Sequence, residues 1–249
     1  MGKTDKIKKA QKIEELEEID ELLIETDNFA TTTQTCEDAW LNRNMNAVVG
    51  ETGLGKTTAL ISHLRNHPEC TYYVKVTKSM NVKLFYSSIY SSTGLMDFDT
   101  QMPIYYVIRK ASNFFCQDST NKLLIIDEAG KFTPPMLEFL HELRDLTKRS
   151  LGIILAGPEY FQTRIEEWEK NGIPGVPELY SRINYWQKLE EPLFKEVKAF
   201  IRKHDINDIE FENENKGVQN FRVLKFRVLR YLEMKKRKDT KNNKNGKSI

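Results

Sequence analysis

One short stretch of the sequence has residue types and spacing suited to binding phosphate groups. Residues 48–60 read VVGETGLGKTTAL, and residues 50–57 fit the pattern G-x-x-x-x-G-K-[S/T] at every fixed position. Glycines let the backbone turn tightly, so that several amide N–H groups point at a β-phosphate. We expect Lys56 to reach the β- and γ-phosphate oxygens and Thr57 to complete the coordination of Mg²⁺, while Thr58 packs or caps locally.

Two acidic residues could complete this chemistry. The stretch KLLIIDEAG puts Asp127 and Glu128 at the carboxyl end of an apolar strand, where parallel sheets bind their ligands. Asp127 can hold Mg²⁺ through its water shell, and Glu128 can orient and deprotonate the water that attacks a γ-phosphate. The alternatives are a chance match on a glycine-rich turn and a solvated acidic turn or helix cap. Together the two stretches predict hydrolysis of ATP with Mg²⁺, since the N-K-x-D signature for guanine is missing from the sequence.

Alternating strands and helices must position these residues. Short apolar runs predict buried strands at 45–50, 71–76, 122–129, 151–157 and 183–189, and helices are expected at 56–67, 82–92, 102–115, 134–148 and 160–170. This order predicts right-handed βαβ units, an α/β fold with a mostly parallel sheet and helices on both faces. One strand, 71–76, separates the glycine-rich strand from the Asp-Glu strand, as in ATPases that insert an extra strand and carry a catalytic glutamate.

The ends of the chain differ from this core. An amphipathic helix is expected at 7–24, and a second helix begins near Thr35, where TCED has the form of a capping box. Two later helical segments, 193–203 and 218–234, suggest a small helical lid. The last residues are basic and nearly lack apolar side chains, which predicts disorder. The expected domains are an N-terminal helix at 1–28, an α/β ATPase core at 29–190, a helical lid at 191–234 and a basic disordered tail at 235–249.

Composition excludes several classes of protein. The 249 residues, 39% of them hydrophobic, are enough to bury a substantial core. No apolar run approaches the roughly 20 residues that cross a membrane, and the start lacks the apolar segment of a signal peptide, so we expect a cytoplasmic protein. Cys36, Cys70 and Cys116 form no C-x-x-C pair, so the cysteines indicate neither a disulfide framework nor a zinc site.

Over residues 29–231 the sequence resembles the AAA+ superfamily of P-loop (ASCE-type) ATPases. Within that superfamily it is similar to the DNA-transposition branch, which includes the B protein of phage Mu and the target-selector ATPases of bacterial transposons. The resemblance rests on the stretches VVGETGLGKTTAL, LLIIDEAGKFTPPMLEFLHELRDLT, GIILAGPEYF and GVQNFRVLKFRVLRYL.

The resemblance implies roles for two arginines. Arg182 in ELYSRI falls where an arginine finger would reach the γ-phosphate held by a neighbouring subunit; the alternative is a surface or salt-bridging arginine. Arg222 lies early in the lid helix, where related ATPases carry an arginine that senses the nucleotide. Because Arg227 and Arg230 share that helix, a plain basic face is the alternative.

The expected nucleotide site departs from the family pattern at one place. Related ATPases end the fourth strand with a polar residue that positions the attacking water, whereas this strand ends on Ala156, Gly157 and Pro158. This departure predicts slow hydrolysis in the absence of a partner. With Arg222, the residues expected to bind the nucleotide are Gly50, Glu51, Thr52, Gly53, Leu54, Gly55, Lys56, Thr57 and Thr58.

The resemblance also implies contact with the backbone of duplex DNA, which gains affinity from counterion release rather than from reading bases. The expected contacts after the second strand are Lys75, Thr77, Lys78 and Lys83. The alternative is that these side chains merely solvate a strand end. The basic tail could add non-specific affinity, bind a partner or only aid solubility.

The favoured hypothesis is an ATP-dependent DNA-binding AAA+ ATPase that oligomerises on duplex DNA, as a helical filament or ring, and marks it as a target for a transposase. One alternative is a replication ATPase of the helicase-loader type, which would need a helicase and prefer single strands. Another is a nucleotide-gated interaction switch that scarcely hydrolyses ATP. A small-molecule kinase fits less well, because the lid resembles a nucleotide sensor.

Overall fold

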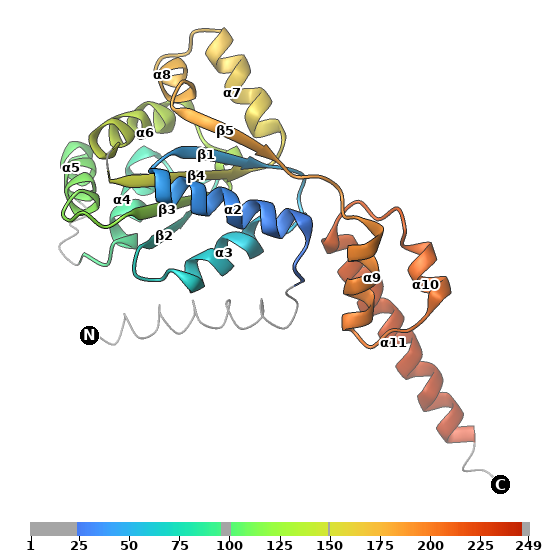
Figure 1. Cartoon of the computed structure of the whole chain (residues 1–249). Helices are drawn as coiled ribbons and strands as arrows, with labels where there is room; N and C mark the ends of the chain where they lie inside the picture. The colour runs from blue at the N-terminus through green and yellow to red at the C-terminus, as the bar shows by residue number, and fades with distance from the viewer. Residues whose placement is uncertain (1–23, 96–100, 149, 246–249) are drawn as a thin grey trace. The chain divides into compact units, whose positions relative to one another are not determined.

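Five parallel strands form the centre of the structure, a computed structural model in which residues 24–95, 101–148 and 150–245 are described. They lie in the order β2-β3-β4-β1-β5 (Figure 1). Their bounds are Met45–Val49 for β1, Thr71–Lys75 for β2, Lys122–Asp127 for β3, Leu151–Gly157 for β4 and Ile183–Lys188 for β5. The predicted α/β fold with a parallel sheet is confirmed. In the sheet it is β4 that separates β1 from β3, whereas β2 intervenes only along the chain.

The register of the strands brings the predicted site residues to one edge of the sheet. Val49 pairs with Gly157 on one side and with Lys188 on the other, and Lys75 pairs with Asp127. All of these residues lie at the carboxyl ends of their strands. The loop after β1 and the acidic pair after β3 therefore share this carboxyl edge, with β4 between them.

The helices that were expected between the strands are present, with ends that differ by at most two residues from the predicted ones. An additional short helix, α8, and a single 3₁₀ turn, η1, were not predicted. The bounds are Lys56–Asn66 for α3, Val82–Ser92 for α4, Ile104–Phe115 for α5, Ala129–Lys131 for η1, Pro134–Thr147 for α6, Tyr160–Lys170 for α7 and Val176–Tyr180 for α8.

The helix α2 (Asp27–Asn42) begins earlier than its sequence suggested. Thr26 is its N-cap, and the Thr26 hydroxyl accepts a hydrogen bond of 3.0 Å from the Phe29 N–H. Thr35 lies in the middle of the helix and donates to the Thr31 carbonyl at 2.8 Å. The predicted capping box at Thr35 is therefore wrong. The Thr35 hydroxyl bonds to a carbonyl one turn earlier in the same helix instead of capping a helix N-terminus.

Helices cover both faces of the sheet, so the strands are apolar on both sides (Figure 1). On one face the buried core joins strand residues such as Ala47 and Ile126 to Phe85 of α4 and Ile108 of α5. On the other face α2 packs with α3 against the sheet. There β4 comes so close to α2 that a Cβ on Gly152 would lie 2.1 Å from the Ala39 carbonyl oxygen.

A second compact unit comprises Glu190–Ile249 together with the loop segment Thr52–Gly55. Its helices are α9 (Phe194–Lys203), α10 (Ile209–Glu214) and α11 (Phe221–Asn245), of which α10 was not predicted. The predicted end of the last helix at residue 234 is wrong, since α11 continues to Asn245. Lysine and arginine are good helix formers, and the chain has no glycine between Gly217 and Gly246 to stop the helix.

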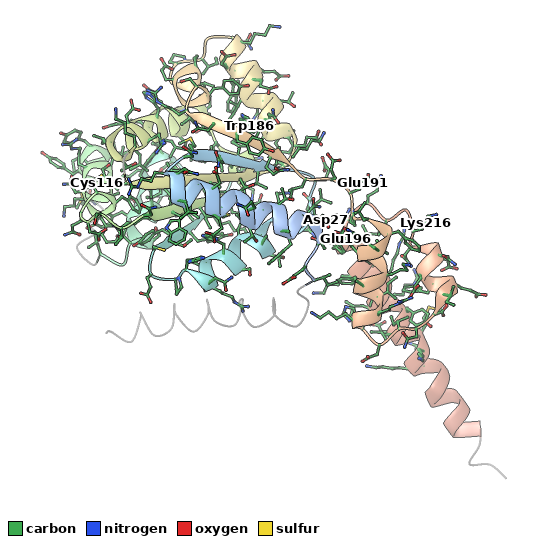
Figure 2. All side chains as sticks on the ribbon, in the orientation of Figure 1. Asp27, Cys116, Trp186, Glu191, Glu196 and Lys216 are labelled. Carbon is green, nitrogen blue, oxygen red and sulfur yellow. The ribbon has the colours of Figure 1, made fainter. Side chains whose placement is uncertain are left out.

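The remaining expectations concern the chain ends and the cysteines. The helix predicted at 7–24 lies almost wholly outside the described residues, so it stays a prediction. Cys36 is buried in α2, Cys70 is partly buried before β2, and Cys116 is exposed at the end of α5 (Figure 2). Among the described residues, no helix has the length and apolar character needed to span a bilayer.

Candidate nucleotide-binding site

The glycine-rich loop joins β1 to α3, whose first residues are Lys56 and Thr57. Gly53 and Gly55 have φ angles of +89° and +90°, a conformation that residues with a side chain rarely adopt. In this loop the Lys56 ammonium donates to the carbonyls of Gly50 at 2.5 Å and Glu51 at 2.9 Å. The helix N-terminus, the turning backbone and the lysine thus meet at one point, which is the arrangement that binds anions.

Asp127 is the centre of a hydrogen-bonded group at the end of β3. Its side chain is buried, with 2% of the residue exposed. The Thr57 hydroxyl donates to Asp127 Oδ2 at 2.7 Å, and the Tyr73 hydroxyl donates to the same oxygen at 2.8 Å. The Glu128 N–H donates to Oδ1 at 2.7 Å. The structure therefore brings together the hydroxyl and the carboxylate that were predicted to hold Mg²⁺.

Tyr73 was not identified from the sequence. It lies on β2, one strand away from Asp127, and strand alternation puts its side chain on the same face as Thr71 and Lys75. The stretch TYYVKV reads only as a half-buried strand, with two adjacent tyrosines that point to opposite faces. Pairing of β2 with β3 is what selects Tyr73 rather than Tyr72, and that pairing is not local in the sequence.

Glu128 follows in a left-handed conformation, with φ at 60° and ψ at 33°. Its carboxylate is 39% exposed and lies 3.3 Å from the Lys131 ammonium. Such backbone is costly for a residue other than glycine. Gly130 allows the turn to pack closely, because a Cβ there would lie 2.6 Å from Pro158 Cδ.

Arg164 of α7 supports this acidic turn and was also missed by sequence analysis. Its guanidinium donates to the carbonyl oxygens of Gly130 and Phe132, and it lies 4.8 Å from the ring centre of Trp168. The end of β4 itself carries no polar side chain at Ala156, Gly157 or Pro158. Arg164 therefore brings a positive charge close to the backbone that follows Glu128.

Arg182 precedes β5 and so lies at the amino edge of the sheet, opposite the glycine-rich loop. Arg182 lies six positions before Lys188, which is about 20 Å along a strand. Its guanidinium pairs with Asp145 of α6, with Nε 3.1 Å from Oδ1. The hydrogen bond from Arg182, followed by the nearby charges of His141 and Lys148, lowers the pKa of Asp145. Arg182 is 43% exposed and cannot reach the loop of its own chain.

Arg222 lies at the start of α11, within the same unit as the loop segment Thr52–Gly55. The Phe221 N–H donates to the Gly53 carbonyl at 2.9 Å. A Cβ on Gly53 would lie 3.0 Å from Asn220 Oδ1 and 3.1 Å from Arg222 Cβ. Arg227 instead donates to Asn215 Oδ1 at 3.0 Å, one helix away. Arg222 is thus the arginine of α11 that lies beside the glycine-rich loop.

The residues expected to contact DNA lie at the end of β2 and in the segment after it, at the carboxyl edge. Lys75, Thr77 and Lys78 are exposed, and Lys83 is partly buried in the first turn of α4. The Val76 N–H donates to the Asp127 carbonyl at 2.9 Å, so this loop starts directly beside the acidic turn. The lysines lie on one short segment whose backbone is tied to β3.

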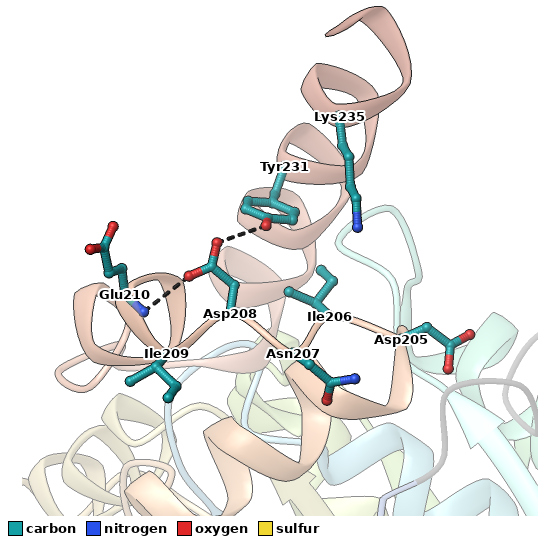
Figure 3. Close-up of a pocket in the computed structure, with 8 residues that line it drawn as sticks. All are labelled: Asp205, Ile206, Asn207, Asp208, Ile209, Glu210, Tyr231 and Lys235. Carbon is teal, nitrogen blue, oxygen red and sulfur yellow. Dashed lines mark hydrogen bonds between the residues drawn. The ribbon is translucent and has the colours of Figure 1, made fainter. Parts of the chain in front are cut away.

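A groove of about 450 Å³ lies in the C-terminal unit between the start of α10 and the middle of α11 (Figure 3). Asp208 caps α10 by accepting hydrogen bonds from the N–H groups of Glu210 at 3.0 Å and Phe211 at 3.1 Å. Tyr231 of α11 donates its hydroxyl to the same carboxylate at 2.8 Å. These contacts explain Asp208 and Tyr231 as residues that fasten α10 to α11.

Comparison with known proteins adds the following findings. The sequence profile described as an AAA domain matches residues 41–165, which is half of the chain. No curated protein sequence matches the chain significantly. Solved structures share the fold at low identity. They include the ORC2 protein of Aeropyrum pernix in ADPNP–ADP complexes, with 14% identity and a TM-score of 0.55 over 70% of this chain and 50% of that one.

Two further structures are similar. The ORC1 protein of Aeropyrum pernix in complex with DNA has 12% identity and a TM-score of 0.56 over 72% of this chain and 49% of that one. The replication initiator DnaA bound to AMPPCP and single-stranded DNA has 16% identity and a TM-score of 0.53 over 87% of this chain and 66% of that one. The chain spans about half the length of the two Aeropyrum proteins.

Proposed function

This chain belongs to the AAA domain family, and from that premise we propose that it is an ATPase that binds DNA in an ATP-dependent manner. The observation that carries this proposal is the 2.7 Å hydrogen bond between Thr57 and Asp127, which joins the glycine-rich loop to the acidic turn. Two oxygen ligands so close together suit Mg²⁺, a hard cation that binds few protein groups alongside substrate phosphates. When bound, Mg²⁺ neutralises charge on the phosphate oxygens.

The residues around this pair have distinct proposed roles. Lys56 leaves the loop carbonyls to bind the β- and γ-phosphates, while backbone N–H groups of the loop hold the β-phosphate. Glu128 orients the attacking water and takes its proton, which requires release of its contact with Lys131. Arg222 contacts the phosphates from the lid. Arg164 positions the turn that carries Glu128 by holding the carbonyls that follow it.

Arg182 is proposed to act on a neighbouring chain. Its place at the amino edge of the sheet rules out its own nucleotide, and a guanidinium supplied in trans would stabilise the charge of the transition state. Such an arrangement makes a homo-oligomer, a filament or a ring, the active form. The ion pair with Asp145 must then break or rearrange when chains assemble.

DNA binding is proposed for the segment after β2, through Lys75, Thr77, Lys78 and Lys83. The exposure of the first three supports contact with a phosphate backbone, and the link between Val76 and Asp127 offers a route by which bound nucleotide alters the segment. The similar ORC1 and DnaA structures contain DNA, which agrees with this proposal.

Two biological roles fit such an ATPase. A replication role of the helicase-loader type is the first, because one of the similar structures is the replication initiator DnaA. The second is selection of target DNA for a transposase, which rests on the resemblance of the quoted sequence stretches alone. The two roles differ in the DNA that they require, single-stranded for a loader and duplex for a target selector.

Electron microscopy of negatively stained samples tests the shared part of the proposal and separates the two roles. The protein is imaged with linear duplex and with single-stranded DNA, in ATP, a slowly hydrolysed ATP analogue, ADP and no nucleotide. Glu128→Gln is expected to trap nucleotide-bound assemblies on DNA. Coats on duplex favour target selection, and coats on single strands favour a loader. Bare DNA of both kinds in every condition, with ATP binding intact, would refute DNA binding.

A further inference from the structure

A second cluster of possible ligands lies between α2 and α3, apart from the nucleotide site. It consists of Glu37 from α2, His63 from α3, and His67, which directly follows the last residue of α3. Glu37 Oε1 lies 3.3 Å from His63 Nδ1 and 3.0 Å from His67 Nε2. One ligand atom from each of the three residues lies within 4.8 Å of the other two.

The contact between His67 Nε2 and Glu37 Oε1 is a hydrogen bond of 3.0 Å. The distances from Glu37 Oε1 to both rings also suit ligands that share one metal ion. Nitrogen and oxygen ligands about 2.0–2.1 Å from a tetrahedral ion are about 3.3 Å from one another. His63 is 1% exposed, and neither of its buried ring nitrogens forms a hydrogen bond in the part of the chain that the structure describes. A buried imidazole without a partner is costly, because its polar atoms have given up water and bind nothing in its place.

We propose that Glu37, His63 and His67 form a binding site for a Zn²⁺-type transition-metal ion. Two imidazoles and one carboxylate are the ligands that such ions prefer, whereas Mg²⁺ and Ca²⁺ prefer oxygen alone. Glu37 and His67 are partly exposed, with 28% and 29% of their side chains accessible, so a water molecule can enter as the fourth ligand. The three residues would hold the ion at the surface of the domain.

Trp40 borders the cluster, with its ring centre 4.7 Å from that of His67 and 6.4 Å from that of His63. An ion bound there would lie close enough to Trp40 to change its fluorescence.

The ion would join α2 to the helix that opens with Lys56 and Thr57. His63 lies six residues after Thr57, about 9 Å along α3. An ion bound by Glu37 and by both histidines would therefore fix the carboxyl end of the phosphate-binding helix to α2. This role is structural and does not depend on whether the chain hydrolyses ATP or binds DNA.

The test uses the full chain, freed of metal by a chelator, without nucleotide. Zn²⁺ is titrated by calorimetry, and Co²⁺ is followed by its visible absorption and by quenching of tryptophan fluorescence. We expect one Zn²⁺ per chain, displacement of Co²⁺ by Zn²⁺, and a higher melting temperature with Zn²⁺ than with Mg²⁺, because an ion that binds only the folded state stabilises it.

Glu37 and His67 are partly exposed, so each can be replaced while the buried His63 is kept. Glu37→Gln and His67→Gln are each expected to weaken Zn²⁺ binding at least tenfold and to remove the rise in melting temperature. His141→Gln is the matched control, since His141 forms an exposed i, i+4 pair with Asp145 at 3.3 Å. Cys70→Ser controls for binding by a thiol near His67. Absence of Zn²⁺ binding, or binding that only the control variants weaken, overturns the proposal.

Discussion

At the scale of single residues, the candidate site depends on how firmly Asp127 is held. Its two oxygens accept three hydrogen bonds, from Thr57, Tyr73 and the Glu128 backbone. The motif residues Thr57 and Asp127 could be predicted because each lies at a fixed place after a strand. Tyr73 and Arg164 could not, because they reach the site from other elements and no local pattern marks them.

Tyr73→Phe removes one of the three donors without changing the volume of the side chain. A hydrogen bond of this kind contributes about 0.5–1.5 kcal/mol, so we expect the Mg²⁺ concentration for half-maximal ATPase activity to rise by about 2- to 12-fold. Initial rates measured against Mg²⁺ concentration check this. Tyr72→Phe is the control, since the Tyr72 hydroxyl donates to the Glu69 carbonyl, at 3.4 Å, on the surface. Equal Mg²⁺ dependence in the two variants would contradict the role of Tyr73.

The pair of Asp145 with Arg182 predicts a dependence of stability on pH. Because the hydrogen bond from Arg182 lowers the pKa of Asp145 below its unfolded value of about 3.9, the pair stabilises the folded chain above that pH and loses this contribution as the pH falls through the lowered pKa. The pair is exposed, so its contribution is only about 0.2–1 kcal/mol.

Urea denaturation at several pH values measures this contribution. The difference in free energy of unfolding between the native chain and Asp145→Asn should shrink as the pH falls below about 4. His141 also contacts Asp145, but it lowers the pKa of Asp145 less than the hydrogen bond from Arg182 does. The difference in free energy of unfolding between the native chain and His141→Gln should therefore be smaller than that for Asp145→Asn. A difference that grows as the pH falls would refute the assignment.

At the scale of elements, the close approach of α2 to β4 gives the sharpest prediction. A Cβ on Gly152 would lie 2.1 Å from the Ala39 carbonyl oxygen and 2.6 Å from its carbon, which are backbone atoms that cannot turn aside. We expect Gly152→Ala to lower the free energy of unfolding by about 1–3 kcal/mol or more, through overpacking. Gly217→Ala, where nothing lies within 4 Å, should melt like the native chain.

Thermal unfolding of both variants makes the comparison. In a chain of this size 1 kcal/mol corresponds to about 2–4 °C in melting temperature. Equal melting temperatures for the two variants would mean that α2 can move away from the sheet at little cost.

The elements that could be predicted are those with strong local patterns. The apolar runs of β1, β3 and β4 and the helices that follow them needed only periodicity, and both strand faces are indeed buried. The short helices α8 and α10 have five and six residues, too few for a periodic pattern. Helix α8 forms because Val176 and Leu179 are buried against the core, and α10 is held by the hydrogen bond from Tyr231 to Asp208, contacts that only tertiary structure supplies.

At the scale of the whole molecule, the cluster of Glu37, His63 and His67 illustrates what the sequence conceals. The two histidines are near each other in the sequence, but the carboxylate comes from a helix that lies before β1. Likewise the arginine that precedes β5 and the loop that follows β1 fall on opposite edges of the sheet only once the strand order is known. Fold class follows from patterns, whereas sites built from several elements follow from packing.

The charge of the C-terminal segment leads to a prediction about DNA binding. Truncation after Met234 removes seven basic residues: Lys235, Lys236, Arg237, Lys238, Lys241, Lys244 and Lys247. If these residues bind phosphates, the slope of log K against log salt should fall in magnitude by about 0.9 for each phosphate that the truncated chain no longer neutralises. Fluorescence anisotropy with labelled duplex at several salt concentrations measures this slope.

The full-length variant with Lys75→Gln and Lys78→Gln serves as the comparison for that truncation. It should reduce the slope by about two units at most, because it removes two charges. An unchanged slope after truncation would assign the basic segment to solubility, and an unchanged slope in the double variant would exclude the segment after β2 from DNA binding.

The position of Arg182 at the amino edge has a consequence for kinetics. If its guanidinium completes the reaction centre of the next chain, ATP turnover per chain should fall when the protein is diluted, since isolated chains lack a complete centre. Chains with Arg182→Ala and chains with Lys56→Ala should each be inactive alone. Mixed together they should recover activity, because an Arg182→Ala chain keeps an intact loop and a Lys56→Ala chain keeps an intact arginine to lend to it.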